Sequence, residues 1–221
     1  MVSAFSLRNK KQELRNLLRN NDVISIADRG VATDTETFDG DTVETDFAIT
    51  NAGVKNIRSV SISSVVQAYG TDYTFSESDS AITTVSFTSA PASGTDNISI
   101  NYDYGTGDKI YDELPQDFIT IDNYPRIGFD IISTVTKEIA FSGAAFQSNF
   151  IIQVNAYGVG KAQSEELIDT IRQLFIDNGD GLFYWNFLSP DSNGPLIESS
   201  IKGSKIFQRS LDIRAEFEFE C

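Results

Sequence analysis

Residues 118–127, FITIDNYPRI, and residues 210–220, SLDIRAEFEFE, bound the part of the chain that decides the fold. In residues 211–219 every second residue is apolar, and the residues between them are charged. This alternation is typical of a strand with one buried and one solvated face. Residues 126–133 and 148–157 have the same period of two, so two further strands are predicted, paired antiparallel with each other. Residues 118–121 are also predicted to be extended, because Pro125 holds the residue before it away from helix.

A helix is predicted between these strands, over residues 162–176. Ser164 is placed to cap it, with Glu165 and Glu166 at the positive end of the helix dipole. The sequence Asp177-Asn178-Gly179 predicts an end in which Asn or Gly takes the left-handed conformation. The apolar residues of one helix face follow at helical spacing: Leu167, Ile168, Ile171, Leu174 and Phe175.

The N-terminal segment is predicted to form a second amphipathic helix. Leu7, Leu14, Leu17 and Leu18 fall on one side, whereas most basic residues fall elsewhere. A helix of about four turns with only leucine anchors is more typical of a helix packed on a core than of one lying on a membrane. Residues 23–27, VISIA, are predicted to form a short strand.

The composition changes to Thr, Ser, Asp and Gly over residues 33–107, which predicts an inserted all-β module. Its strands are expected at residues 45–49, 57–66, 73–76, 83–88 and 97–102. The predicted fold class is therefore α+β: a mostly antiparallel sheet with helices packed on one face, plus the inserted module. The predicted domains are a core of residues 1–32 and 108–221 and a β-sandwich-like module of residues 33–107.

The net charge of −15 is concentrated in the middle of the chain. Residues 1–32 carry a charge of +3, residues 33–123 of −13 and residues 124–221 of −5. An acidic middle block disfavours wrapping of nucleic acid, which depends on clustered Lys and Arg. No apolar run approaches the roughly 18 residues of a spanning helix, so no membrane partner is expected.

Little in the sequence supports catalysis. The chain has no histidine, which excludes Ser-His-Asp and Cys-His catalysis and metal sites that need histidine. Residues 177–181, DNGDG, are out of register for an EF-hand, and residues 105–109, GTGDK, lack phosphate-loop spacing. No cofactor and no metal are therefore expected, and the lone Cys221 cannot form an intrachain disulfide. A pair of carboxylates acting as in glycosidases remains an open alternative, because the chain has 32 acidic residues.

The element order resembles that of the tail terminator, or tail completion, proteins of long-tailed phages and related viruses. The resemblance is carried by the strand beginning at Tyr124-Pro125-Arg126-Ile127, the helix of residues 162–176 and the alternating strand of residues 210–220. It covers about 130 of the 221 residues, namely the first 30 or so and those from about residue 118 onward. The inserted module is a departure from the simplest members. Its sequences GTDY (70–73) and VSFTSAPASG (85–94) resemble a small β-module that recurs in virion proteins.

The resemblance implies a structural, non-enzymatic role in the virion tail or neck, after synthesis in the host cytoplasm. Family members form a ring, usually a homohexamer, that caps the tail tube, ends tube growth and joins the tail to the neck or head-completion protein. The implied partners are further copies of the chain, the tail tube protein, the neck protein and the tail sheath, with DNA only passing through the lumen. An acidic lumen would let DNA pass without binding.

A ring needs head-to-tail interfaces, which an exposed sheet edge or the aromatic run of residues 182–187, LFYWNF, would supply. For that run, a core strand or a subunit interface is favoured over sugar stacking. Two other classes of function stay open besides the carboxylate-pair enzyme: another neck or tail-tube ring component, and a peripheral adhesin whose β-module binds a receptor or glycan. The candidate interface residues are Tyr124, Arg126, Phe183, Trp185, Phe187, Arg209 and Arg214.

Overall fold

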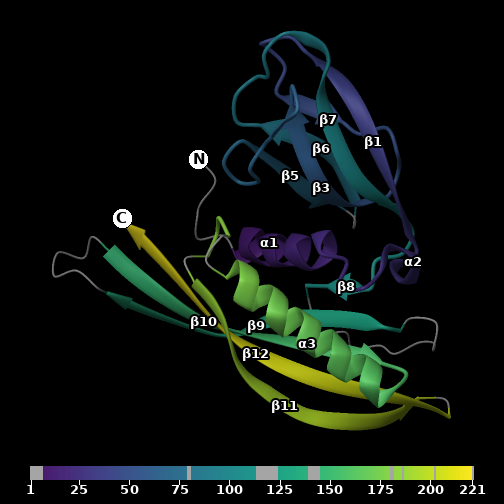
Figure 1. The fold of residues 1–221 in the computed structure, drawn as a ribbon. Helices are drawn as coiled ribbons and strands as arrows, with labels where there is room; N and C mark the ends of the chain where they lie inside the picture. Colours follow the sequence, from purple (N-terminus) through teal and green to yellow (C-terminus); the bar gives the residue numbers. More distant parts are fainter. Residues whose placement is uncertain are drawn as a thin grey trace. The chain divides into compact units, whose positions relative to one another are not determined.

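The computed structural model describes residues 7–78, 81–112, 124–138, 145–179, 182–185, 187–201 and 203–220. The predicted extended segment 118–121 and Cys221 lie outside these residues. The contacts divide the chain into two compact units (Figure 1). Unit 1 comprises Met1–Ile24 and Lys109–Cys221, and unit 2 comprises Ser25–Asp108. The sequence had placed these divisions after residues 32 and 107.

Unit 1 is built on a five-stranded sheet in the order β11-β12-β10-β9-β8. Ile152 of β10 lies opposite Ile213 of β12 on one side and Ile131 of β9 on the other. All neighbouring strands are antiparallel except β8 and β9, which are parallel. The strands are β8 (Ile110–Tyr111), β9 (Arg126–Glu138), β10 (Ala145–Gly158), β11 (Phe187–Ile201) and β12 (Ser204–Glu220).

The alternation predicted for β10 and β12 is confirmed, since the apolar residues of both strands are buried. They form the core of unit 1 with the apolar face of helix α3 (Lys161–Asn178), which contacts β10, β11 and β12. The buried strand residues are Phe150, Ile152, Val154 and Ala156 of β10 and Leu211, Ile213, Ala215 and Phe217 of β12.

The predicted apolar face of α3 and its end at residues 177–179 are confirmed, but the two predicted caps are wrong. The helix begins at Lys161, after Gly160, so Ser164 does not cap it but lies buried inside it, donating a hydrogen bond of 2.9 Å to the Lys161 carbonyl. Gln163 takes over part of the capping by accepting from the Val159 N–H at 3.0 Å. At the other end Gly179 has φ −60°, so the left-handed ending is absent.

Helix α1 (Leu7–Asn20) confirms the predicted N-terminal helix, with Leu14 and Leu18 buried. The strand predicted at residues 23–27 is wrong, because a short helix α2 (Ile26–Arg29) begins there. Ser25 explains the difference. Its hydroxyl accepts from the Asp28 N–H at 3.1 Å and donates to the Asp28 carboxylate at 2.7 Å, a local cap that outweighs the β-propensity of the isoleucines.

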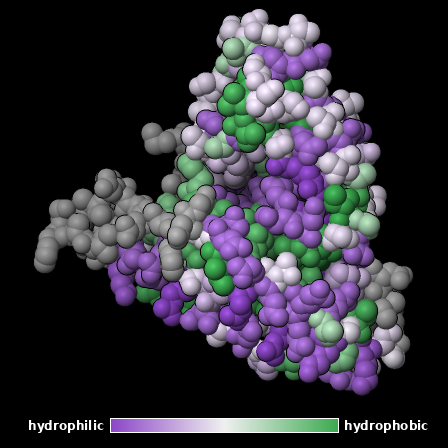
Figure 2. All heavy atoms as spheres, in the orientation of Figure 1, coloured by the Kyte–Doolittle hydropathy of each residue, from purple (hydrophilic) through white to green (hydrophobic). Residues whose placement is uncertain are grey.

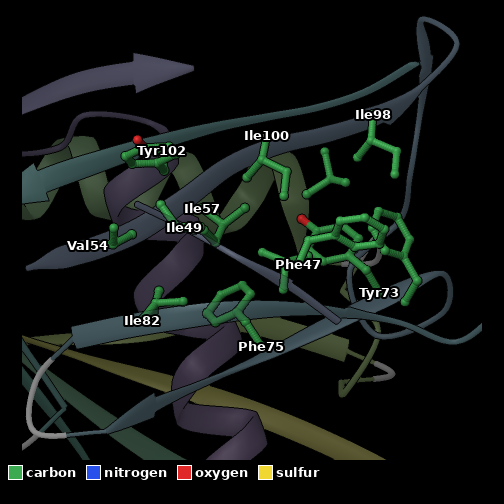
Figure 3. Packing of buried hydrophobic residues seen from close by; sticks show 13 residues of the cluster. Phe47, Ile49, Val54, Ile57, Tyr73, Phe75, Ile82, Ile98, Ile100 and Tyr102 are labelled. Carbon is green, nitrogen blue, oxygen red and sulfur yellow. The ribbon is translucent and has the colours of Figure 1, made fainter. Parts of the chain in front are cut away.

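Unit 2 contains α2 and a sheet whose seven strands have the order β1-β7-β3-β6-β2, with β4 paired to β3 and β5 paired to β6. Strands β3 and β6 pair through Val54 and Ile82. Figure 3 shows that the core side chains of unit 2 meet between the strands, with Ile100 and Tyr102 facing Ile82 and Phe75. The strands are β1 (Val31–Gly40), β2 (Asp46–Ala48), β3 (Val54–Ile62), β4 (Val65–Val66), β5 (Tyr73–Ser78), β6 (Ala81–Phe87) and β7 (Gly94–Gly105).

The predicted fold class, α+β with helices packed on one face of a sheet, is wrong. The protein is mostly β, with 56% of its residues in strands and 20% in helices, and one of its two sheets curls into a half-barrel. Two segments that lack a strand pattern account for much of the difference. Strands β1 and β11 have the sequences VATDTETFDG and FLSPDSNGPLIESSI, and they become strands by pairing with β7 and β12.

The two connections of unit 2 to the rest of the chain lie side by side. Val31, the first residue of β1, pairs with Gly105, the last residue of β7. A Cβ on Gly30 would lie 3.8 Å from the Cα of Gly107. Unit 2 therefore has the geometry of an insertion that leaves and returns at one point.

Removal of residues 31–106, with Gly30 joined to Gly107 by a short Gly-Ser link, is expected to leave unit 1 folded. Because the joined ends are adjacent, we expect the free energy of unfolding of unit 1 to change by less than about 1 kcal/mol. Trp185 is the only tryptophan of the chain and lies in unit 1, so its fluorescence during urea unfolding reports on this unit. A broad, non-cooperative transition in the shortened protein would contradict the expectation.

Candidate functional site

A groove of about 340 Å³ lies on the sheet of unit 1, where β9, β10 and β12 adjoin. Its lining follows from the period of two, since Asn149 and Ile151 alternate with the buried Phe150 and Ile152. We call it the sheet groove. It is lined by Ser133, Val135 and Lys137 of β9, Asn149, Phe150 and Ile151 of β10, and Arg214 and Glu216 of β12.

The sheet groove combines apolar surface with charges of both signs. Val135 and Ile151 are exposed large apolar side chains. Around them, the Glu216 carboxylate accepts from Gln147 at 3.0 Å, and the Arg214 guanidinium lies 3.4 Å from the Asp191 carboxylate. That ion pair is exposed, so it contributes at most about 1 kcal/mol. This mixture suits a contact with another protein surface more than the enclosure of a small molecule.

Tyr124 and Arg126 lie together but are buried within unit 1. Tyr124 packs with Tyr157 and Ile206, and the Arg126 guanidinium carbon lies 4.8 Å from the centroid of the Tyr111 ring. Burial raises the pKa of Tyr124 and of Tyr157, and the charge of Arg126 opposes the shift. These two candidates therefore stabilise one end of the sheet and present little surface to a partner.

The aromatic run divides between the surface and the interior. The Phe183 side chain is 51% exposed, whereas that of Trp185 is 2% exposed. The backbone of Phe187 pairs with Glu216 at the start of β11, and its side chain is outside the described part of the structure. Arg209 lies partly buried in β12, opposite Ala156 and Leu196. Of the candidate residues, Arg214 is the one that lines the sheet groove.

Lys10 is a buried cation that the sequence pattern misses. Its ammonium nitrogen lies 3.4 Å from the ring centroid of Phe217 and 4.6 Å from that of Trp185, and it donates to the Tyr184 carbonyl. The Trp185 indole N–H in turn donates to the Lys10 carbonyl at 3.4 Å. Burial lowers the pKa of Lys10 to about 7, although the charge of Glu13 raises it.

Glu13 lies one turn further along α1 and fixes the same segment. Its carboxylate accepts from the backbone N–H groups of Phe183 at 2.5 Å and Tyr184 at 2.8 Å. Burial raises the pKa of Glu13, and the two N–H donors oppose that shift. Through Lys10 and Glu13, α1 holds residues 182–185 in place from a distance of more than 160 positions in the sequence.

The stability of unit 1 is expected to rise with pH above neutrality because of Lys10. In the unfolded chain the pKa of Lys10 returns to 10.5. Between about pH 7 and 10.5 the unfolded state therefore binds more protons than the folded state. The free energy of unfolding should therefore increase by up to about 3 kcal/mol from pH 7 to 9.5. The aromatic rings over the ammonium stabilise its charged form, which reduces this increase. Urea unfolding followed by Trp185 fluorescence measures this increase.

Lys10→Met should flatten this pH dependence, and Lys161→Met, at an exposed lysine, should preserve it. Measurements stop near pH 9.5 because burial raises the pKa of the unit 1 tyrosines Tyr124, Tyr157 and Tyr184, and ionisation of these tyrosines in the unfolded state lowers stability above about pH 10. The prediction would be contradicted if the free energy of unfolding rose equally with pH in the wild type and in Lys10→Met.

Unit 2 contains a second buried ionic cluster, centred on Asp103. Its carboxylate accepts from Arg29 at 2.8 Å and Arg58 at 2.5 Å, and from Thr33 at 3.0 Å and Asn56 at 3.3 Å. Burial raises the pKa of Asp103, but the hydrogen bonds from Arg58 and Arg29 outweigh it and hold the pKa below its usual value. The cluster joins α2, β1, β3 and β7 at the end of unit 2 where its two connections lie.

The described residues contain no group of three or more His, Cys, Asp or Glu side chains that could hold a metal ion. None of the helices in this part of the chain has the length and apolarity that crossing a membrane requires. No protein-family model matches the chain, and no curated protein matches its sequence.

Proposed function

We propose that the chain is a structural virion protein whose copies form a ring that caps the tail tube, ends its growth and joins the tail to the neck or head-completion protein. The order of elements in unit 1 is the observation that carries the proposal. Helix α1 is followed by the antiparallel pair β9 and β10, then α3, then β11 and the alternating strand β12. This is the order on which the resemblance to tail terminators rests.

The sheet groove is the surface of unit 1 that we assign to a neighbouring copy of the chain. Lys137 and Arg214 supply positive charge and Glu216 supplies negative charge around the exposed Val135 and Ile151. A head-to-tail ring repeats one contact between two different patches of each subunit. Charges of both signs around an apolar centre set the orientation of such a contact without a large net charge.

The charge of the chain supports passage of DNA through the ring. At −15 the protein repels the phosphate backbone, so DNA would move through the lumen with little binding. The tail tube protein and the neck protein are the partners at the two ends of the ring, and the tail sheath is a further partner in a contractile tail.

The test is the mass of the purified protein, by light scattering, with and without the tail tube protein of the same virus, followed by negative-stain imaging. We expect a closed ring, one subunit thick, that binds the ends of tail tubes and stops their growth. Val135→Asp should prevent ring formation by placing a charge in the contact, whereas Ile176→Asp, on the exposed side of α3, should leave the ring intact.

A stable monomer that ignores tube ends would overturn the proposal. It would favour a neck component that needs a different partner, or an adhesin. If the Val135→Asp variant formed rings as well as the wild type, the proposal of a ring would stand, but the sheet groove would be excluded as the contact between subunits.

A further inference from the structure

We infer that the end of unit 2 farthest from its connections is a docking surface for a protein that presents an apolar surface bordered by Lys or Arg side chains. The strands of unit 2 run from the end near α2 to a set of turns at the opposite end (Figure 1). Val31 pairs with Gly105 at the first end, and Gly40 pairs with Gly94 at the second. We call the second end the distal end. The inference does not depend on whether the chain forms a ring.

The most exposed large apolar side chains of the described residues all lie at the distal end. Val43 is 79%, Val66 73% and Val65 64% exposed. The face of the molecule seen in Figure 2 has hydrophobic residues among hydrophilic ones on both units. Single exposed valines need no explanation, but three at the same end of one unit are available to one partner.

The segments that carry these valines are held in place by Asn97. Its backbone carbonyl accepts from the Ser63 N–H at 2.6 Å, and its side-chain oxygen accepts from the Gly40 N–H at 2.8 Å. The Asn97 side-chain amide also donates to the Ala92 carbonyl at 2.7 Å. Ser63 begins the turn that leads into β4 with Val65 and Val66, and Gly40 ends β1 just before Val43. One residue thus fixes both valine-bearing segments.

Asp41 orders the loop that presents Val43. Its carboxylate accepts from the backbone N–H groups of Glu44 at 2.7 Å and Val43 at 2.8 Å, and these hydrogen bonds lower the pKa of Asp41. The Thr42 N–H donates to the Pro91 carbonyl at 3.0 Å, which ties the loop to its neighbour. A pre-ordered loop loses little conformational entropy when a partner binds.

An acidic groove of about 540 Å³ adjoins the loop that carries Val43. Phe38 and Phe47 contribute to its lining, with their ring centroids 5.6 Å apart, and four carboxylates lie around it. The groove shares Glu44 with the loop of Val43. Its lining residues are Thr37, Phe38, Asp39, Glu44, Asp46, Phe47, Ala48 and Asp96.

The charges of unit 2 are segregated along its length, and this decides the chemistry of the partner. Residues 25–108 contain three basic residues, Arg29, Lys55 and Arg58, against 13 acidic ones. Arg29 and Arg58 bind Asp103, and Lys55 follows Val54, which pairs with Tyr104 near the connections. Positive charge is thus confined to the other end. The distal end repels nucleic acid and anionic lipid and attracts basic protein surfaces.

The test uses an amphipathic helical peptide of Leu and Lys as a probe of defined chemistry, with Ser-Lys and Leu-Glu peptides of the same length for comparison. Fluorescence anisotropy with the full chain should give a Kd for the Leu-Lys peptide at least about tenfold lower than for either of the others. The combined change Val43→Ser, Val65→Ser and Val66→Ser should raise that Kd to the value of the Ser-Lys peptide. Ile176→Ser, at an exposed apolar residue of α3, should have no effect.

A second pair of changes tests the groove. Glu44→Gln with Asp46→Asn should weaken binding of the Leu-Lys peptide several-fold and reduce its dependence on salt. If the triple valine variant fails to fold, Val65→Ser with Val66→Ser alters β4 alone and should still weaken binding. Unchanged affinity in the valine variants would overturn the proposal. Valine-dependent binding to phosphatidylcholine vesicles without binding of the Leu-Lys peptide would overturn it in favour of a lipid surface.

Discussion

Asp103→Asn is expected to lower the free energy of unfolding of unit 2 by about 3–5 kcal/mol. The substitution keeps the shape of the side chain and removes its charge, so the fully buried guanidinium of Arg29 no longer faces the negative charge that lies 2.8 Å away in the wild type. Arg58 loses its charged partner as well. Hydrogen exchange of the β1 and β7 backbone in the full chain measures the stability of unit 2 separately from that of unit 1.

The pH dependence of this variant provides a second readout. The pKa of Asp103 is held below its usual 3.8, so its contribution to stability is present above about pH 4 and is lost as the pH falls through the pKa of the folded state. The stability difference between the wild type and Asp103→Asn should therefore narrow under acid conditions. A constant difference from neutral to strongly acid pH would contradict the role of the charge.

Asp34→Asn is the matched control for Asp103→Asn. Asp34 lies in β1, close to the same cluster in sequence, but its side chain is exposed and accepts from Asn51 at 2.9 Å. The expected cost is below about 1 kcal/mol. If both substitutions had the same small effect, the buried cluster would contribute little beyond what a neutral hydrogen-bonded group supplies.

The sequence predicts those helices and strands whose conformation and buried face are determined by the spacing of apolar residues within one segment. Strands β10 and β12 and the apolar face of α3 each carry their periodicity in consecutive residues, and the burial of Phe150, Ile213 and Leu167 follows it. Strand β11 has no such pattern. Its Pro190 and Pro195, together with Asn193 and Gly194, are typical of a loop, and its strand conformation depends on pairing with β12, which includes register shifts near Pro190 and Asn193.

The candidate interface residues could not be sorted into buried and exposed ones from the sequence, for a related reason. Burial of a polar side chain depends on partners far along the chain, as for Lys10 and Tyr184, which are separated by 174 positions. The pattern of α1 assigns its basic residues to a solvated face, yet Lys10 and Arg19 are fully buried. Arginine and tyrosine near Pro125 likewise read as surface candidates, but Tyr124 and Arg126 pack inward. Arg214 is correctly placed at the surface because the alternation of β12 determines its face.

Trp185→Ala is expected to lower the free energy of unfolding of unit 1 by about 3–5 kcal/mol, measured by urea unfolding followed by circular dichroism. The indole is buried, and its ring centroid lies 5.2 Å from that of Phe150 in an edge-to-face arrangement at 84°. The substitution leaves a cavity and also removes one of the rings over the Lys10 ammonium. This prediction distinguishes the two roles left open for the aromatic run, because a residue needed only at an interface would not stabilise the isolated chain.

Phe183→Ala is the control, since it removes an aromatic side chain two positions away. Phe183 is exposed and contacts the Tyr184 ring at a centroid separation of 4.8 Å, so its removal should cost less than about 1 kcal/mol. A double-mutant cycle of Trp185→Ala with Lys10→Met then isolates the contact between the cation and the ring. The two changes should be non-additive by about 0.5–2 kcal/mol at pH 6, where Lys10 is charged, and closer to additive at pH 9, where it is largely neutral. Additivity at both pH values would show that Trp185 stabilises unit 1 through packing alone.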